Sequence, residues 1–166
     1  LSKLLAERES ELASYDALIA DAELRRNAVE ETSRGLSAQL DARTREMFAL
    51  KTIELVAKYL PRAVKDGNDI EAREHVAFAN TLSGHVMELG ACSSEHSMEH
   101  AMSAMHPNLP HGAGLIMIAH AYYDFFAERK ASEESMKKMA RAMGVENPTS
   151  GKDFIAALDK LIADVG

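Results

Sequence analysis

Helix-breaking residues are almost absent from the first 60 positions of this chain. No proline precedes Pro61, and Gly35 is the only glycine before Gly67. Within residues 1–33, apolar side chains recur at steps of three, four or seven residues, which places them on one face of a helix: Leu5, Leu12, Tyr15, Ile19, Ala22 and Val29. We therefore predict one amphipathic helix that ends at Gly35 and a second helix that continues to about Leu60.

The rest of the sequence carries the start signals of further helices. After the KDGND turn, Asn68 and Glu71 have the spacing of a capping box, and Ser150 with Asp153 has it again. Other residues suited to helix starts are Ser93 or Ser94, Pro110 and Ser132. No run alternates in the manner of a strand. We predict an all-α fold, a helical bundle of about seven helices with short connections, forming one domain over residues 1–166.

Charge and cysteine content argue against several classes of function. The chain has 26 acidic and 19 basic residues, and its net charge of -7 is opposite to the basic patch that a nucleic-acid surface requires. The same charge argues against an anionic membrane, and no apolar run approaches the about 18 residues of a transmembrane helix. Cys92 is the only cysteine, which fits a reducing compartment. We expect a cytoplasmic protein with neither nucleic-acid nor membrane partners.

Four of the seven histidines fall within SSEHSMEHAMSAMHPNLPHGAGL, residues 93–115. His96 and His100 are four residues apart on one predicted helix, so they share a face. His111 follows a short proline-containing turn and stands in the first turn of the next helix, where the chain can fold back toward His96. Two or three imidazoles meeting at one point suit Zn, Fe(II), Ni or Cu. The alternative is a helical hairpin with solvated or core histidines, which we favour for the remaining four: His75, His85, His106 and His120.

A metal centre of this kind often includes a carboxylate. Glu95 and Glu99 neighbour the histidines in sequence, but successive residues of a helix point about 100° apart around its axis. A carboxylate ligand would therefore have to come from another helix. If a carboxylate such as Asp16 or Asp41 came within reach, the site could become complete.

The segment EHSMEHAMSAMHPNLPHGAGLIMI resembles the C-terminal helical domain of the iron-containing (group III) alcohol dehydrogenases. The family motif is a histidine, three residues, a second histidine, about ten residues and then Pro-His-Gly. The upstream stretch ALKTIELVAKYLPRAVKDGNDIEAREHVAFANTLSGHVMELG is similar to the helices that precede this motif in the family. The resemblance covers about residues 47–166. Residues 1–45 do not match, so we distinguish a helical segment over 1–45 from a dehydrogenase-like body over 46–166.

This resemblance implies a two-domain, NAD(P)-dependent oxidoreductase. In such enzymes an α/β domain binds the dinucleotide, and the helical domain binds Fe(II) or Zn(II) through one Asp and three His. By resemblance, His96 and His111 are metal ligands, and His100 is a catalytic residue that lines the substrate and nicotinamide site. The family's Asp-x-x-x-His motif has no counterpart, because no histidine precedes His75. The glycine-rich dinucleotide segment is also missing, so we expect no NAD(P) binding by this chain alone.

Three hypotheses follow from these observations. The first is an excised or engineered helical domain of this family, with an incomplete metal site that binds Fe(II) or Zn(II) weakly or not at all, and without activity on its own. The second is one part of an NAD(P)-dependent and Fe- or Zn-dependent alcohol oxidoreductase whose dinucleotide-binding domain is supplied separately. The third is a self-associating helical module, a homo-oligomer formed through residues 1–33.

Overall fold

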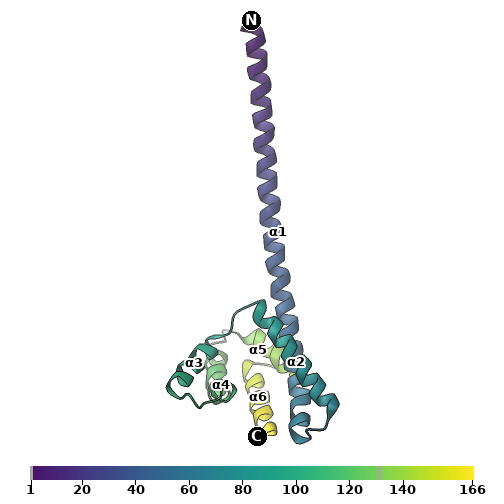
Figure 1. The fold of residues 1–166 in the computed structure, drawn as a ribbon, viewed down its shortest axis with the longest axis vertical. Coiled ribbons are helices and arrows are strands. Elements are labelled where there is room, and N and C mark those ends of the chain that lie inside the picture. The colour runs from purple at the N-terminus through teal and green to yellow at the C-terminus, as the bar shows by residue number, and fades with distance from the viewer. Residues whose placement is uncertain (1, 131) are drawn as a thin grey trace. The chain divides into compact units, whose positions relative to one another are not determined.

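The computed structural model describes residues 2–130 and 132–166, and every regular element in these ranges is a helix. The helices are α1 (Ser2–Lys65), α2 (Ile70–Glu88), α3 (Ser94–Met105), α4 (His111–Glu128), α5 (Glu133–Ala142) and α6 (Gly151–Val165), as Figure 1 shows. The all-α prediction is confirmed, with six helices in these ranges where about seven were predicted. None of the helices described is long and apolar enough to cross a membrane.

Gly35 accounts for the difference in the number of helices. The two helices predicted before Leu60 are parts of one helix, α1, so the prediction of a break at Gly35 was wrong. Gly35 is not among the glycines with positive φ, so its backbone does not adopt the left-handed conformation of a helix cap. A glycine inside a helix costs only about 1 kcal/mol relative to alanine. The helix-forming residues on both sides outweigh that cost.

The chain divides into two compact units, Leu1–Arg43 and Thr44–Gly166. In the first unit the described part is helical, and its apolar stripe is exposed, including Leu5, Leu12, Tyr15, Ile19 and Val29. Its charged side chains pair between neighbouring turns, for example Arg25 with Asp21 at 2.7 Å. Exposed pairs of this kind contribute little to stability. The self-association predicted for residues 1–33 stays a prediction.

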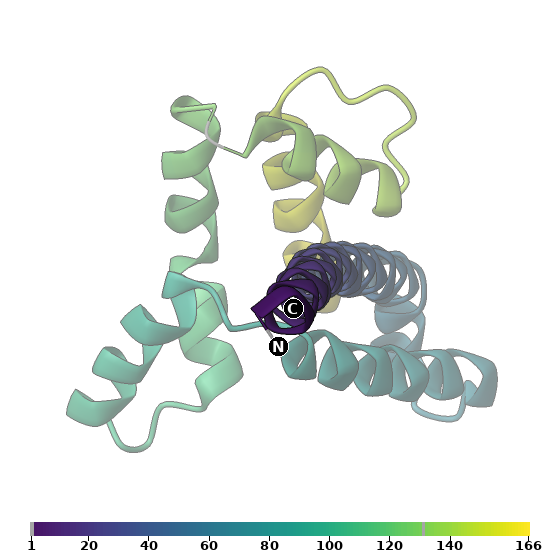
Figure 2. The ribbon, with the colours of Figure 1, turned by 90° about the horizontal axis from the view of Figure 1, so that it is seen from above.

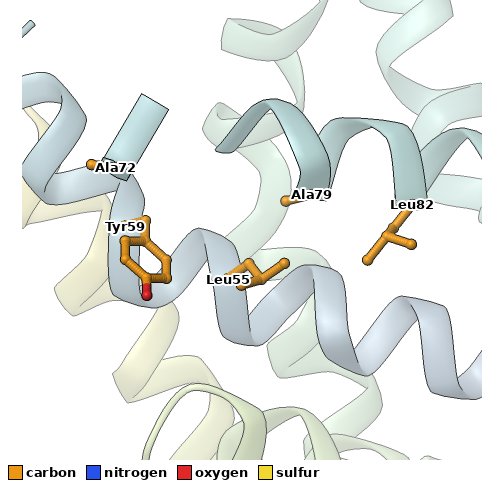
Figure 3. Packing of buried hydrophobic residues seen from close by; sticks show 5 residues of the cluster. All are labelled: Leu55, Tyr59, Ala72, Ala79 and Leu82. Carbon is orange, nitrogen blue, oxygen red and sulfur yellow. The ribbon is translucent and has the colours of Figure 1, made fainter. Parts of the chain in front are cut away.

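In the second unit, the C-terminal part of α1 packs against α2. The buried residues of this interface are Leu55 and Tyr59 of α1 with Ala72, Ala79 and Leu82 of α2 (Figure 3). The two alanines are completely buried, which lets the helix backbones approach closely. The ring of Tyr59 also stacks on His75 of α2, with ring centroids 4.0 Å apart. A second ring contact joins Phe48 of α1 to His85 of α2, with ring centroids 5.9 Å apart. The interface therefore combines apolar burial with two aromatic contacts.

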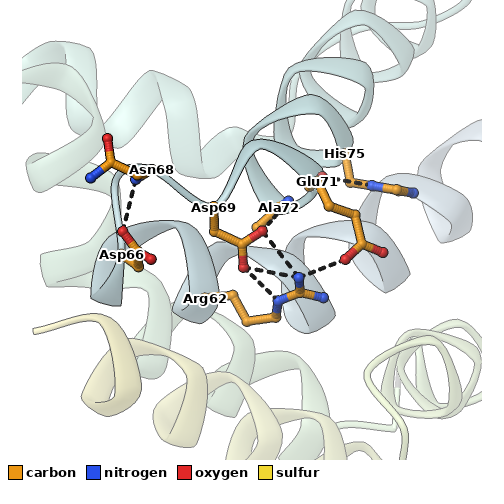
Figure 4. A network of polar contacts seen from close by, with 7 residues as sticks. All are labelled: Arg62, Asp66, Asn68, Asp69, Glu71, Ala72 and His75. Atoms are coloured by element: carbon orange, nitrogen blue, oxygen red, sulfur yellow. Dashed lines mark hydrogen bonds and ion pairs between the residues drawn. The ribbon is translucent and has the colours of Figure 1, made fainter.

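Polar contacts around Asp69 hold the turn between α1 and α2 (Figure 4). The guanidinium of Arg62 donates to Asp69 at 2.9 Å and to Glu71 at 2.7 Å. Asp69 also accepts from the backbone N–H of Ala72 at 3.0 Å, and this bond holds the pKa of its carboxyl below the ordinary value. Asp69 is therefore the N-cap of α2. The expected cap, Asn68, lies one residue too early for its side chain to take that position.

Among the remaining helices, α4 contacts α3, α5 and α6. Figure 2 shows α3 beside α4. Met136 and Ala140 of α5 are buried with Phe154 and Ile155 of α6. The ring of Phe154 meets Tyr123 of α4 edge to face, with ring centroids 5.1 Å apart. This core fixes α4 from one side, and α3 packs on the same helix. The histidine-rich segment lies on the α3–α4 hairpin that results.

The predicted capping box at the start of α6 is present. Asp153 accepts from the backbone N–H of Ser150 at 2.9 Å and of Thr149 at 2.6 Å, and these bonds lower the pKa of its carboxyl below the ordinary 3.8. A lowered folded-state pKa stabilises the fold above the unfolded value, and the contribution is lost as the pH falls through the folded value. We expect Asp153→Asn to reduce the free energy of unfolding near neutral pH, with the difference from wild type shrinking below pH 3.8. Urea unfolding at several pH values measures this, and a difference that does not change with pH would contradict it.

Candidate metal centre

The histidine-rich segment forms a tight hairpin. Helix α3 ends at Met105, and His106 is its C-cap residue. The N–H of Leu109 donates to the carbonyl of His106 at 2.9 Å, which closes a turn. Pro110, with φ of -62°, is the N-cap of α4. The chain therefore reverses within a few residues, and His111, the first residue of α4, returns toward α3.

His96, His100 and His111 come together at this hairpin. One ring nitrogen from each residue lies within 4.8 Å of the other two. The ring centroids are 5.2 Å apart for His96 and His111, 5.4 Å for His100 and His111, and 6.5 Å for His96 and His100. Nitrogens bound to one tetrahedral zinc, each at about 2.0–2.1 Å from the metal, lie about 3.4 Å from each other. The nitrogens, which lie within 4.8 Å of one another, would have to approach to about this distance to bind one ion together.

The donor set fits a divalent transition metal. Neutral imidazole is a common ligand of Zn(II) and Fe(II). His96 is half-buried, whereas His100 and His111 are exposed, so the cluster is open to solvent on one side. No carboxylate belongs to this set among the residues that the structure describes. Asp16 and Asp41, the carboxylates that would complete the site if they came within reach, lie in the unit Leu1–Arg43.

Glu99 contacts His111, and the sequence pattern did not predict this contact. Its side chain is fully buried, and its carboxylate contacts Nδ1 of His111 and accepts from the hydroxyl of Ser103. The Ser103 bond first, and then His111, hold the pKa of the Glu99 carboxyl below its ordinary value. We expected Glu99 to point away from the histidines, because successive residues of one helix point about 100° apart. This angle does not constrain His111, because that ring belongs to α4 and approaches Glu99 from the neighbouring helix.

The other buried carboxylate of α3, Glu95, has different surroundings. It accepts from the hydroxyl of Tyr123 at 3.3 Å, and burial raises its pKa above the ordinary value. Burial also raises the pKa of Tyr123. Glu95 lies in the wall of a mainly apolar cavity of about 370 Å³ that is otherwise lined by α1, α4, α5 and α6. This carboxylate therefore lines the interior of the bundle, and His96 also acts on it electrostatically.

The four histidines expected to be structural or solvated lie outside the cluster. His75 bonds through Nδ1 to a backbone carbonyl at 2.8 Å. His85 lies 3.7 Å from a carboxylate on its own helix. His120 points away to Asp159 of α6, at 2.9 Å. His106 is the C-cap residue of α3 and does not belong to the cluster.

The chain is similar in sequence and in structure to several known proteins. The model of the Fe-containing alcohol dehydrogenase family, C-terminal part, matches residues 36–166. The match begins earlier than residue 47, where the resemblance noted in the sequence starts. Among curated proteins, the long-chain primary alcohol dehydrogenase of Thermoanaerobacter ethanolicus is 36% identical over 69 residues, which are 42% of this chain and 17% of that protein. Alcohol dehydrogenase 4 of Schizosaccharomyces pombe is 33% identical over 114 residues, which are 68% of this chain and 26% of that protein.

Two solved structures share the arrangement of the helices. An archaeal halo-thermophilic Red Sea brine pool alcohol dehydrogenase, solved bound to NZQ, superposes with a TM-score of 0.69 at 29% identity, over 74% of this chain and 32% of that one. A 1,3-propanediol oxidoreductase superposes with a TM-score of 0.67 at 27% identity, over the same 74% and 32%. The chain thus spans about a third or less of the length of the proteins that it matches.

Proposed function

Because this chain belongs to the Fe-containing alcohol dehydrogenase family, through its C-terminal helical domain, we propose that it supplies the metal-binding part of an NAD(P)-dependent alcohol oxidoreductase. The observation that carries the proposal is the convergence of three histidine nitrogens within 4.8 Å at the α3–α4 hairpin. The relatives named as alcohol dehydrogenases support the substrate class.

We assign different roles to the three histidines. His96 and His111 bind the metal: their rings form the closest pair of the cluster, and His111 is held by a buried carboxylate, as metal-ligating histidines usually are. His100 is exposed and stands beside both rings, where it can contact an alcohol oxygen or its proton. A divalent ion held here would act as a Lewis acid that polarises the alcohol or carbonyl oxygen.

The dinucleotide belongs, in this proposal, to a part of the enzyme outside this chain. A hydride-transfer enzyme must position its cofactor against the substrate. The residues described here form helices only, whereas the glycine-rich dinucleotide motif follows a strand. The chain also spans only about a third of its solved relatives. Alcohol oxidation is therefore expected when the dinucleotide-binding part is supplied, and not from this chain alone.

A metal titration of the purified, untagged chain tests the proposal. We expect calorimetry to show one Zn(II), or one Fe(II) added anaerobically, per chain. His96→Ala and His111→Ala should each weaken binding by more than the about 10–100-fold that loss of an outer-shell partner costs. His100→Ala should leave the affinity close to that of wild type, because this residue is assigned to the substrate.

His120→Ala is the matched control for that titration. His120 lies on α4, as His111 does, but it pairs with Asp159 away from the cluster. Its replacement should not change the affinity or the stoichiometry. A wild-type chain that binds no metal, or binding that is equal in all four variants, would contradict the proposed function.

A further inference from the structure

Glu99 has a charged side chain at a buried position, and burying a charge costs free energy. It is completely buried, and an ionised carboxylate is rarely found in that state without partners. Its partners are the hydroxyl of Ser103, which bonds Oε1, and Nδ1 of His111, which contacts Oε2. Both oxygens are therefore engaged, one within α3 and one across to α4. The carboxylate links the two helices directly at the histidine cluster.

The contact with His111 determines which of its ring nitrogens carries the proton. A carboxylate accepts hydrogen bonds and cannot donate one when ionised, so Nδ1 of His111 must be the protonated nitrogen. The lone pair of the neutral ring is then on Nε2, the nitrogen available to a metal. Carboxylates placed behind metal-ligating histidines fix the tautomer and the ring orientation in this way and make the ligand more basic.

Gly114 provides the space that Glu99 occupies. It lies one turn after His111 on α4 and is buried. A Cβ atom at position 114 would lie 2.7 Å from Cγ and 2.7 Å from Oε1 of Glu99, which is too close for any real contact. Gly114 is not among the glycines with positive φ, so its backbone does not itself require a glycine. The glycine is therefore needed because a side chain at position 114 would occupy the space of the Glu99 carboxylate.

We propose that Glu99 is a positioning residue of the metal centre: from the space left by Gly114, its carboxylate holds His111 with the proton on Nδ1 and with Nε2 as the metal-binding nitrogen. The role in metal binding rests on the proposed function above, whereas the protonation of His111 can be measured without any metal. Glu99 itself contacts neither the metal nor the substrate in this proposal.

Nitrogen-15 NMR of the metal-free chain tests the protonation of His111. We expect His111 in the wild type to be the Nδ1–H tautomer at a pH where the ring is neutral. Glu99→Ala should move it toward the Nε2–H tautomer that is ordinarily favoured for free histidine. Gly114→Ala, which adds one methyl group, should act in the same direction, because it displaces the carboxylate. An Nε2–H ring in the wild type, or the same tautomer in wild type and Glu99→Ala, overturns the proposal.

Zinc affinity tests the consequence for the metal. We expect Glu99→Gln, which keeps the shape and an acceptor oxygen but removes the charge, to weaken Zn(II) binding by about 10–100-fold. Glu95→Gln is the matched control, since Glu95 is the other buried carboxylate of α3 and faces Tyr123, and it should bind zinc as the wild type does. Equal affinities for wild type and a folded Glu99→Gln overturn the positioning role.

The two measurements separate this inference from the proposed function. If the wild type binds no zinc, the proposed function fails, and the tautomer of His111 in the metal-free chain still decides what Glu99 does. If the wild type binds zinc and Glu99→Gln binds it equally well, the proposed function stands and the role of Glu99 is refuted. Circular dichroism of each variant shows that it is folded, and Glu99→Gln is the variant that perturbs the packing least.

Discussion

Phe154→Ala is expected to lower the free energy of unfolding by about 3–5 kcal/mol, the usual cost of removing a buried phenylalanine ring. Phe154 is only 5% exposed and packs with Met136, Ala140 and Ile155 between α5 and α6. It also makes the edge-to-face contact with Tyr123 that joins α6 to α4. Alanine would remove both contributions and leave a void that the neighbouring side chains fill only in part.

Urea unfolding followed by circular dichroism measures this effect. Phe78→Ala is the matched control, because the ring of Phe78 on α2 is 53% exposed, and its loss should cost about 0.5 kcal/mol or less. A Phe154→Ala variant as stable as Phe78→Ala would contradict the core described for α4, α5 and α6. If metal binding also weakens in Phe154→Ala, the histidine hairpin depends on that core for its position.

Zinc is expected to stabilise the folded chain by an amount that depends on its free concentration. A ligand that binds only the folded state adds about 2.7 kcal/mol to the free energy of unfolding when its free concentration is 100 times Kd. The His96→Ala/His111→Ala variant should lose this gain entirely, because both proposed ligands are absent. Any binding of zinc by histidines of the unfolded chain reduces the gain, so the comparison is made at the same zinc concentration.

Thermal unfolding with and without zinc measures this linkage. The wild type should melt at a higher temperature with zinc, and the double variant should melt at the same temperature in both conditions. The His120→Ala variant keeps all three clustered histidines and should respond as the wild type does. An equal response of wild type and double variant would mean that zinc acts at another site.

The helical class of the fold could be predicted from local sequence, because spacing and capping are local properties. The capping box of Ser150 and Asp153 is present where the pattern indicated it. The prediction of a helix break at Gly35 was wrong, because a glycine permits a helix end but does not impose one. The residues on both sides of Gly35 continue α1. At the start of α2, the pattern located the turn correctly but assigned the cap to Asn68 instead of Asp69.

The candidate site could be predicted only in part. His96 and His100 could be placed on one face by their spacing, and the PHG turn indicated that His111 returns toward them. Glu99 could not be found in this way, because its contact with His111 joins two helices. One feature of the sequence fits this contact: Gly114, three residues after His111, stands inside a predicted helix, where a glycine lowers helix stability unless it serves packing.

X-ray absorption at the zinc K-edge of the loaded chain tests the central claim most directly, because it reports the atoms around the metal. We predict two imidazole nitrogens at about 2.0–2.1 Å, from His96 and His111, with oxygen atoms at the remaining positions. The imidazole signal should disappear in the His96→Ala/His111→Ala variant. A zinc shell of oxygen atoms alone in the wild type, or an imidazole signal that persists unchanged in the double variant, would contradict a metal centre at the α3–α4 hairpin.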